Sequence, residues 1–248
     1  SYNTIMYNVF LGFDGNAAAL HGDFNQFTMN YVGTNGQGNV PGKQSDPDLI
    51  CSPVDWLGGG GISLEGDDHY VGVNIFAGLR QQIFSNSTQP DAIHVLSNTR
   101  NHILEGNAIG VDKSGQDVGV CGRGIYLAEP TGVLAVENEI ANSGLSAISL
   151  NGILYDANQL QGNVIRRETP WPQDGLNPEA EDAIQLGPNL PQALQNFAPA
   201  RVTKIAGKQI SGTSGPGSPC PGCIVEVFLD DRDGIVEALA LLESVTAD

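Results

Sequence analysis

The segment Gly124-Ile125-Tyr126-Leu127 gives the clearest indication of the fold, because its pattern of a small residue followed by apolar, polar and apolar residues occurs five times. The other copies are Gly61-Ile62-Ser63-Leu64, Ala92-Ile93-His94-Val95, Ala147-Ile148-Ser149-Leu150 and Ala183-Ile184-Gln185-Leu186. Alternation of this kind is typical of a β-strand that buries one face. A second repeat, 12 to 15 residues after the isoleucine, pairs an asparagine with an isoleucine at Asn74, Asn107, Asn138 and Asn163. Two strands per repeat indicate a coil.

The spacing of the copies also favours a solenoid. The isoleucines at 62, 93, 125, 148 and 184 are separated by 31, 32, 23 and 36 residues. Short alternating strands cannot bury their apolar faces alone, but they share one interior when each repeat stacks on the next. We therefore predict an all-β protein built on a parallel β-helix, with a β-sandwich or a leucine-rich horseshoe as alternatives. The repeated asparagine is expected at a corner, where Asn tolerates left-handed backbone angles and its amide bonds to the next coil.

Composition limits the classes of partner. The chain has 248 residues, with 32 Gly, 14 Pro and 6% aromatic residues, which is typical of a turn-rich β architecture. Its 11 Lys and Arg against 28 Asp and Glu give a formal net charge of −17. Nucleic acid is not expected as a partner, because phosphate binding depends on Lys and Arg. No run approaches the roughly 18 apolar residues of a membrane helix, so we do not expect the chain to span a membrane.

The variation in repeat length falls at one place, just before each alternating strand. Four insertions share this place: 38–59, 84–90, 113–123 and 167–181. Insertions at one corner of a solenoid build a surface on one side, which is often its binding face. Trp56 and Trp171 lie in two of these insertions, and the plane of a Trp side chain suits stacking on a sugar ring. The alternative is that each Trp covers its own loop.

The four cysteines favour disulfides over a metal site. Cys220 and Cys223 form a single CxxC, whereas a zinc site needs four ligands. Cys51 and Cys121 lie in insertions on the same side, two repeats apart, and flexible loops can close the roughly 10 Å between such repeats. We predict one disulfide between Cys51 and Cys121 and a second between Cys220 and Cys223.

The repeats end near residue 200. We therefore predict a β-helix over residues 1–200 and a second unit over residues 201–248. Three strand-like runs, at 202–205, 208–211 and 224–229, are similar to the opening of an immunoglobulin-like sandwich. By periodicity alone, the run 235–245 also fits a helix.

Two segments are similar to a known family. Asn107-Ala108-Ile109-Gly110-Val111-Asp112-Lys113-Ser114-Gly115, followed by Gly124-Ile125-Tyr126-Leu127, resembles its turn. Ile210-Ser211-Gly212, followed by Cys220-Pro221-Gly222-Cys223-Ile224-Val225-Glu226-Val227-Phe228, resembles its trailing module. The family is that of secreted bacterial right-handed parallel β-helix repeat proteins that end in immunoglobulin-like modules. The resemblance implies export, a right-handed coil, a strand within 235–245 and a partial immunoglobulin-like module. The family includes adhesins, sugar-binding proteins and carbohydrate-active enzymes.

The outward positions of the five alternating strands bear on catalysis. They are Ser63, Glu65, His94, Leu96, Tyr126, Ala128, Ser149, Asn151, Gln185 and Gly187. A glycosidase needs two carboxyl groups about 5 to 10 Å apart, and Glu65 is the only acidic residue among these positions. We therefore doubt that this face hydrolyses glycosidic bonds.

One polar cluster is the best candidate for ligand binding. His94 and Tyr126 are expected side by side, with Asp91 and Arg123 two residues before the respective isoleucines. Stacking would let Asp91 and Arg123 pair as an exposed salt bridge, worth roughly 0 to 1 kcal/mol. As a binding site the cluster would hold a sugar hydroxyl, and the alternative is an ordinary surface.

A metal site has weaker support. Asp23, Asp67 and Asp68, with His21 and His69, follow their strands at similar offsets, and carboxylate oxygens suit Ca²⁺. Asp at a strand end more often forms a turn. We therefore predict no cofactor, with Ca²⁺ as the one ion considered.

These features lead to a functional expectation. We predict an exported, non-catalytic structural or adhesive protein, located extracellularly or at the cell surface. We expect it to associate with itself through its β-helix ends or its immunoglobulin-like module, or to bind another cell-surface protein. The alternative is a polysaccharide-binding or polysaccharide-cleaving protein that uses the side of Trp56 and Trp171.

Overall fold

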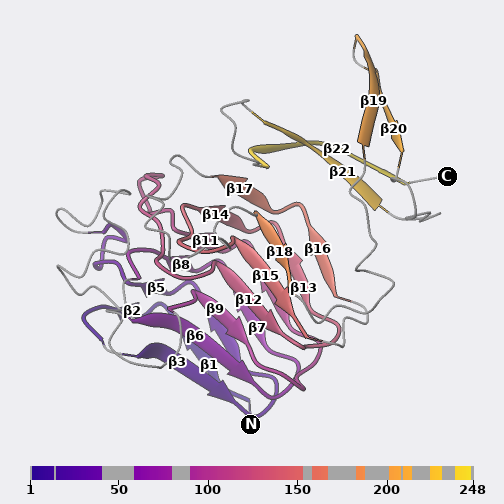
Figure 1. The fold of residues 1–248 in the computed structure, drawn as a ribbon. Helices are drawn as coiled ribbons and strands as arrows, with labels where there is room; N and C mark the ends of the chain where they lie inside the picture. The colour runs from indigo at the N-terminus through magenta and orange to yellow at the C-terminus, as the bar shows by residue number, and fades with distance from the viewer. Residues whose placement is uncertain are drawn as a thin grey trace.

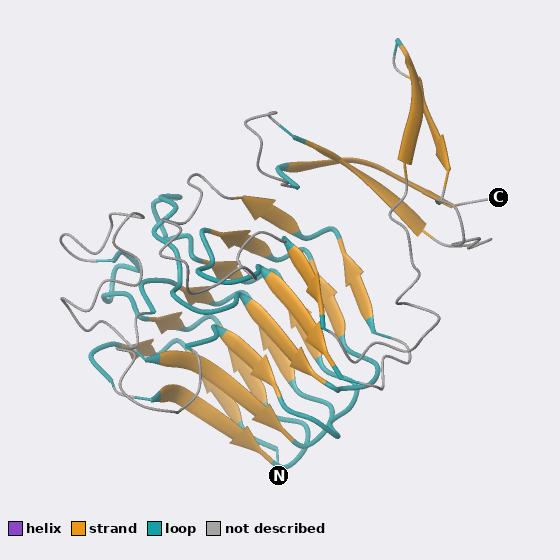
Figure 2. Cartoon of the chain, viewed as in Figure 1, coloured by secondary structure: helices purple, strands orange, loops and turns teal. Residues whose placement is uncertain are grey.

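The structure is a computed structural model that describes residues 2–13, 15–40, 59–79, 90–152, 158–166, 183–187, 201–207, 209–213, 224–230 and 238–246. Every helix or strand in these ranges is a β-strand, as the sequence predicts (Figure 2). The same ranges contain no helix that is long and apolar enough to cross a membrane.

Three parallel six-stranded sheets form the body of the protein (Figure 1). Sheet A contains β1 (Thr4–Met6), β4 (Gln26–Thr28), β7 (Tyr70–Gly72), β10 (Ile103–Glu105), β13 (Leu134–Val136) and β16 (Gln159–Gln161). Sheet B contains β2 (Val9–Phe10), β5 (Tyr31–Val32), β8 (Ile75–Phe76), β11 (Ala108–Ile109), β14 (Glu139–Ala141) and β17 (Val164–Arg166). Sheet C contains β3 (Asn16–His21), β6 (Gly60–Glu65), β9 (Ile93–Val95), β12 (Ile125–Ala128), β15 (Ile148–Asn151) and β18 (Ile184–Leu186).

The chain visits sheets A, B and C in turn, so each coil contains three strands. The prediction of two strands per repeat is therefore wrong, although the predicted parallel β-helix is confirmed. The sequence does not reveal sheet A because its three-residue strands bury different positions: β10 buries Leu104 alone, whereas β7 buries Val71 and Gly72. The strands of this sheet therefore share no common pattern of buried positions.

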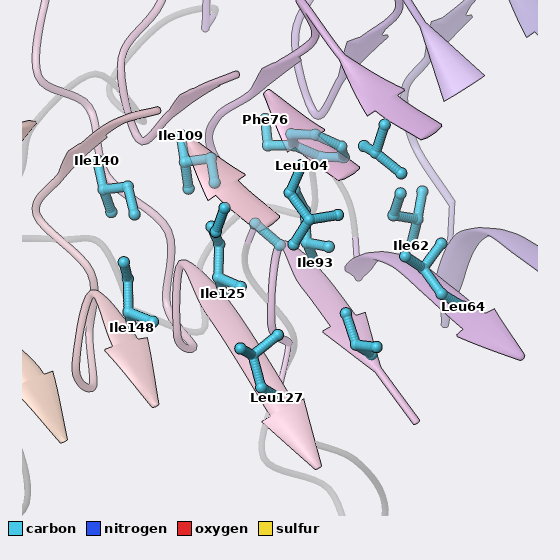
Figure 3. Close-up of a cluster of buried hydrophobic side chains, with 14 of the residues drawn as sticks. Ile62, Leu64, Phe76, Ile93, Leu104, Ile109, Ile125, Leu127, Ile140 and Ile148 are labelled. Carbon is cyan, nitrogen blue, oxygen red and sulfur yellow. The ribbon is translucent and has the colours of Figure 1, made fainter. Parts of the chain in front are cut away.

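Four of the predicted isoleucines, Ile62, Ile93, Ile125 and Ile148, stand in one column on the inner face of sheet C (Figure 3). Ile62 pairs with Ile93, and the register continues through Ile125 and Ile148 to Ile184. The first four of these side chains are fully buried. Phe27, Phe76, Leu104 and Ile140 meet them from sheets A and B in one apolar cluster. Burial of such side chains stabilises the fold by about 1.5 to 3 kcal/mol each.

The small residue of each repeat has a steric cause. A Cβ on Gly61 would lie 1.9 Å from the carbonyl oxygen of Ala92, and a Cβ on Gly124 would lie 2.6 Å from that of Ala147. Adjacent coils approach each other too closely at this point for a side chain at either glycine. The pattern found in the sequence therefore reports the close contact between coils where each sheet C strand begins.

The predicted asparagine ladder occupies the corner between sheets A and B. Its members are Asn8, Asn30, Asn74, Asn107, Asn138 and Asn163. In each step the backbone N–H and Nδ2 of one asparagine donate to Oδ1 of the next, at 2.9 to 3.2 Å. The left-handed backbone angle belongs to the preceding residue, for example Val73 with φ 58° before Asn74. The predicted amide bonding is thus confirmed, and the strained position is one residue earlier than expected.

The long connections run from sheet B to sheet C, as predicted. The connection within 113–123 lies between β11 and β12, while 142–146 is the short link from β14 to β15. In the former, Asp112 Oδ1 accepts bonds from the backbone N–H groups of Ser114 and Gln116, which orders the turn. The insertions at 38–59, 84–90 and 167–181 fall mostly outside the described residues.

Two hairpins follow the β-helix in the described ranges. β19 (Arg201–Ala206) pairs antiparallel with β20 (Gln209–Thr213), and β21 (Ile224–Leu229) pairs antiparallel with β22 (Ala240–Thr246). The predicted strand runs 202–205 and 224–229 are confirmed, the run 208–211 is confirmed for 209–211, and the strand alternative for 235–245 is confirmed for 240–245. The two hairpins form separate two-stranded sheets, so they do not establish an immunoglobulin-like sandwich. The predicted boundary near residue 200 lies outside the described residues and stays a prediction.

Candidate functional site

The outer face of sheet C presents a row of polar side chains in register. Ser63 pairs with His94, His94 with Tyr126, Tyr126 with Ser149, and Ser149 with Gln185. We call these five residues the outer row. Their side chains point outward because their neighbours in each strand, the column isoleucines and leucines, point into the core. These five of the ten predicted outward positions therefore lie on the outer side of sheet C, although Ser149 is buried there.

Asp91 and Arg123 pair beside the outer row, as the sequence suggests. The backbone N–H of Arg123 donates to Asp91 Oδ1 at 3.0 Å, and its Nη1 lies 3.6 Å from the same oxygen. The side chains are only 3% and 13% exposed. The expectation of an exposed salt bridge is therefore wrong, because the close packing of coils at this corner excludes water from both groups.

Burial dominates the electrostatics of this pair. Desolvation raises the pKa of Asp91 to about 6, and the charge and hydrogen bonds of Arg123 offset this rise only in part. Desolvation, followed by the positive charge of Arg123, lowers the pKa of His94 to about 4. His94 is therefore neutral at neutral pH, and its Nδ1, 3.9 Å from Asp91 Oδ2, does not form an ion pair with that carboxylate.

Tyr126 joins the predicted residues into one cluster. The ring of His94 lies 4.7 Å from the ring of Tyr126, and the Arg123 guanidinium lies 4.3 Å from its centroid. Asn151 Nδ2 donates to the Tyr126 hydroxyl at 3.0 Å. The Oδ1 of Asn151 is buried and has no partner among the described residues. The sequence predicts Asn151 on this face but not its contact with Tyr126, because that contact depends on the register between β12 and β15.

This arrangement suits hydrogen bonding better than acid–base catalysis. At neutral pH it offers an imidazole, a phenol, an amide and one paired carboxylate. Glu65, the acidic residue of the outward positions, contacts His21 at 2.6 Å near the N-terminal end of sheet C. A glycosidase places two carboxyl groups about 5 to 10 Å apart across the sugar. The described strands of sheet C show no such arrangement.

The aspartates considered for Ca²⁺ form bonds between coils instead. Asp23 Oδ1 accepts a bond from the backbone N–H of Asp67 at 3.0 Å. Asp67 Oδ2 lies 3.4 Å from Nε of Arg100, and Asp68 Oδ1 accepts a bond from Asn101 Nδ2. In the described ranges no three His, Cys, Asp or Glu side chains are grouped so as to hold a metal ion. These bonds favour the turn-forming role that the sequence offered as the alternative.

His69, also considered for Ca²⁺, belongs to a second ladder at the corner between sheets C and A. Its successive positions are Asn3, Asn25, His69, His102, Val133 and Asn158. His69 Nδ1 accepts from the backbone of Asn25 at 3.2 Å, and its Nε2 faces Glu65 O at 3.2 Å. A ring that accepts at Nδ1 and donates at Nε2 has no lone pair left for a metal ion. Because the residue type changes along this column, the sequence did not reveal it.

Several predicted residues cannot be placed in the site. Trp56, Trp171, Cys51, Cys220 and Cys223 lie outside the described residues. Cys121 is described and is disulfide-bonded. The pairing of Cys51 with Cys121, and of Cys220 with Cys223, stays a prediction.

One ion network was not predicted from the sequence. Arg166 in β17 donates from Nε and Nη2 to both carboxylate oxygens of Asp117, at 3.2 and 2.7 Å. Its Nη1 also pairs with Glu139 of the preceding coil. The bond to Asp117 and the other carboxylate contacts raise the pKa of Arg166. The network ties the 113–123 connection to a coil that lies 49 residues further along the chain.

The chain matches no protein-family model, no curated protein and no solved structure.

Proposed function

We propose that this protein is an exported, non-catalytic structural and adhesive element of the cell surface. In this proposal a right-handed β-helix forms a rigid scaffold, the connections from sheet B to sheet C present its contact surface, and the C-terminal hairpins belong to a partial immunoglobulin-like module. Self-association through the ends of the β-helix is part of the proposal. A net charge of −17 keeps such a surface soluble.

One observation supports the structural role most strongly. Ionised side chains of the described coils contact one another across coils: Asp91 with Arg123, Asp67 with Arg100, and Arg166 with Asp117 and Glu139. A catalytic acid or base must exchange its proton with a substrate. Carboxylates held in such pairs stabilise the stack of coils and are poorly placed for that exchange.

The test is an assay for cleavage. The protein is incubated with a panel of neutral and acidic polysaccharides, and the release of reducing ends and of unsaturated products is measured. We expect no release above a heat-denatured control. Release that disappears in Asp91→Asn would contradict the proposal and would identify the cluster as a catalytic site.

The second candidate is a polysaccharide-binding protein. The supporting observation is the buried, unpartnered Oδ1 of Asn151 beside the Tyr126 hydroxyl, which accepts a bond from Asn151 and retains its own proton. Together they would accept from and donate to neighbouring hydroxyl groups of a sugar. Trp56 and Trp171 would add stacking surfaces in this candidate.

A glycan array tests this second function. Wild type is compared with Tyr126→Phe and with the matched control Tyr70→Phe, whose hydroxyl donates to Glu105 on sheet A. Loss of glycan binding in Tyr126→Phe alone would support a site on sheet C. Equal binding by all three proteins would place any glycan site elsewhere.

A further inference from the structure

The asparagine ladder has a direction. The backbone N–H of each asparagine donates to Oδ1 of the asparagine one coil further along the chain, as Asn8 donates to Asn30 at 2.9 Å. The first coil is therefore left with an acceptor, Asn8 Oδ1, and the last with a donor, the N–H of Asn163. Neither atom has a partner among the described residues. The two ends of the ladder are complementary to each other.

The second ladder, between sheets C and A, ends in the same way. Asn3 donates its N–H to Asn25 Oδ1 at 3.1 Å, and Val133 donates to Asn158 Oδ1 at 2.8 Å. Within the described ranges, Asn3 Oδ1 accepts no bond and the N–H of Asn158 donates none. Each end of the β-helix thus presents two equivalent groups, acceptors at the first coil and donors at the last.

Apolar side chains accompany these groups at both ends. At the first coil, Met6, Val9 and Leu11 are 43%, 47% and 43% exposed. At the last coil, Ile184 and Leu186 occupy core columns yet are 44% and 48% exposed, because no further strand covers sheet C in the described ranges. Unpaired strand edges with apolar side chains are a template for pairing with another chain.

The hairpin β21–β22 lies beside β17, the sheet B strand of the last coil (Figure 1). Ile165 and Ala238 exchange two backbone hydrogen bonds of 3.0 Å each. The Glu226 carboxylate accepts the N–H of Gly162 at 2.9 and 3.0 Å. We call these contacts the hairpin cap.

The cap imitates a following coil. In earlier coils the N–H at the position of Gly162 donates to a backbone carbonyl of the next coil: Val73 to Glu105, Gly106 to Val136, and Glu137 to Gln161. Glu226 supplies an oxygen where that carbonyl would lie. Because the hairpin and an added coil need the same N–H groups, they cannot occupy the end of sheet B together.

We propose that the first coil of one molecule stacks on the last coil of a second copy of this chain, and that the hairpin cap must leave the last coil before they join. The inference deepens the proposed function, on which it rests. Head-to-tail stacking places acceptors against donors and keeps the strands parallel. Head-to-head stacking would place Asn8 Oδ1 against its own copy and would make the strands antiparallel, so the ladders could not continue.

The experiment compares molar masses by size-exclusion chromatography with light scattering over a range of concentrations. The cap-release variant combines Glu226→Ala, which removes the carboxylate, with Ala238→Pro, which removes the N–H that bonds Ile165. Its matched control is Glu243→Ala, on β22 of the same hairpin. A milder variant, Glu226→Gln, keeps the shape of the side chain. The head-block variant adds Val9→Lys and Leu11→Lys to the cap-release background.

We expect the cap-release variant to assemble at a concentration at least tenfold below that needed by wild type. Glu226→Gln should assemble at an intermediate concentration, Glu243→Ala should match wild type, and the head-block variant should stay monomeric. Far-UV circular dichroism establishes that each variant retains its β structure.

A folded cap-release variant that associates no more readily than wild type would overturn the role of the cap. Assembly that survives the head block would overturn the head-to-tail contact. Neither result affects the cleavage assay, which separately tests the non-catalytic part of the proposed function.

Discussion

His69 and His102 lie one above the other at the corner between sheets C and A. Their ring centroids are 5.1 Å apart, and the ring planes are inclined by 17°. The backbone N–H of His69 donates to Nδ1 of His102 at 3.2 Å, just as Asn25 donates to Nδ1 of His69. Both imidazoles must therefore be unprotonated at Nδ1, so this corner of the β-helix depends on neutral histidines.

This dependence predicts a loss of stability in mild acid. Burial, followed by the neighbouring His69, lowers the pKa of His102 from 6.5 to about 4, while nearby Asp67 opposes the shift. Burial also lowers the pKa of His69, against the charges of Asp23, Asp67 and Asp68. The unfolded chain therefore takes up protons first as the pH falls. The contribution of the neutral histidines to the free energy of unfolding is complete above about pH 6.5. It is lost progressively as the pH falls towards 4, and the loss for His102 is at most about 3 kcal/mol.

The variant His102→Asn isolates this effect. Its Oδ1 would accept the N–H of His69, as asparagines do elsewhere in the ladder, but it does not titrate. Urea unfolding at several pH values between 7 and 4 should show a weaker pH dependence in the variant than in wild type. Asp91 titrates in the opposite sense in both proteins, since its raised pKa of about 6 makes its protonation favour the fold below that pH. Parallel pH profiles for the two proteins would contradict the role of His102.

Val133 interrupts the same ladder, which leads to a stabilising substitution. The N–H of His102 is buried and has no acceptor in the described ranges, because the next position holds a valine. We expect Val133→Asn to supply that acceptor, with its Nδ2 directed at the carbonyl of Glu129 in the manner of Asn25 towards His21. The free energy of unfolding should rise by about 0.5 to 1.5 kcal/mol, which is the net contribution of one hydrogen bond. Thermal unfolding measures it, and a lower melting temperature would show that the lost valine packing outweighs the bond.

The sequence predicted those parts of the β-helix in which one residue type repeats at one position. The isoleucine column and the asparagine ladder are of this kind. The second ladder could not be recognised in the sequence, because the equivalent position holds Asn in some coils, His in others and Val in one. His69 therefore resembled a metal ligand. Asp91 and Arg123 were placed correctly on neighbouring coils, but their burial depends on how closely the coils pack. The contact of Glu226 with Gly162 could not be predicted, because the hairpin that holds Glu226 does not carry the repeat of the coils.

A substitution in the interior of the asparagine ladder should lower the free energy of unfolding far more than a substitution at its end. Asn107 bonds to Asn74, Asn138 and the carbonyl of Val71, and it is buried. Asn107→Ala leaves buried N–H and carbonyl groups unpaired, each at a cost of about 1 to 3 kcal/mol. Asn8→Ala, at the exposed end, serves as the control and should cost less than half as much in urea unfolding. Equal losses would argue against a continuous ladder.

The buried and exposed salt bridges provide a matched pair of tests. Arg123→Ala leaves the Asp91 carboxylate buried without its counter-charge. We expect the free energy of unfolding at neutral pH to fall by about 3 to 5 kcal/mol. Arg100→Ala removes the partner of Asp67 from an arginine that is 65% exposed, and the loss should stay within about 1 kcal/mol. Chemical denaturation at pH 7 measures both. Similar losses would mean that the Asp91 site is open to water.

In a single stack of coils, sheet C rises by one strand spacing per coil. Spin labels at Ala19, Ser63 and Gln185 lie on the outer faces of β3, β6 and β18, which are the first, second and sixth strands of this sheet. At about 4.8 Å per strand, electron paramagnetic resonance should give backbone separations of about 5 Å for 19–63, 19 Å for 63–185 and 24 Å for 19–185. The largest separation should equal the sum of the other two. A 19–185 separation clearly shorter than that sum would contradict a single stack of coils.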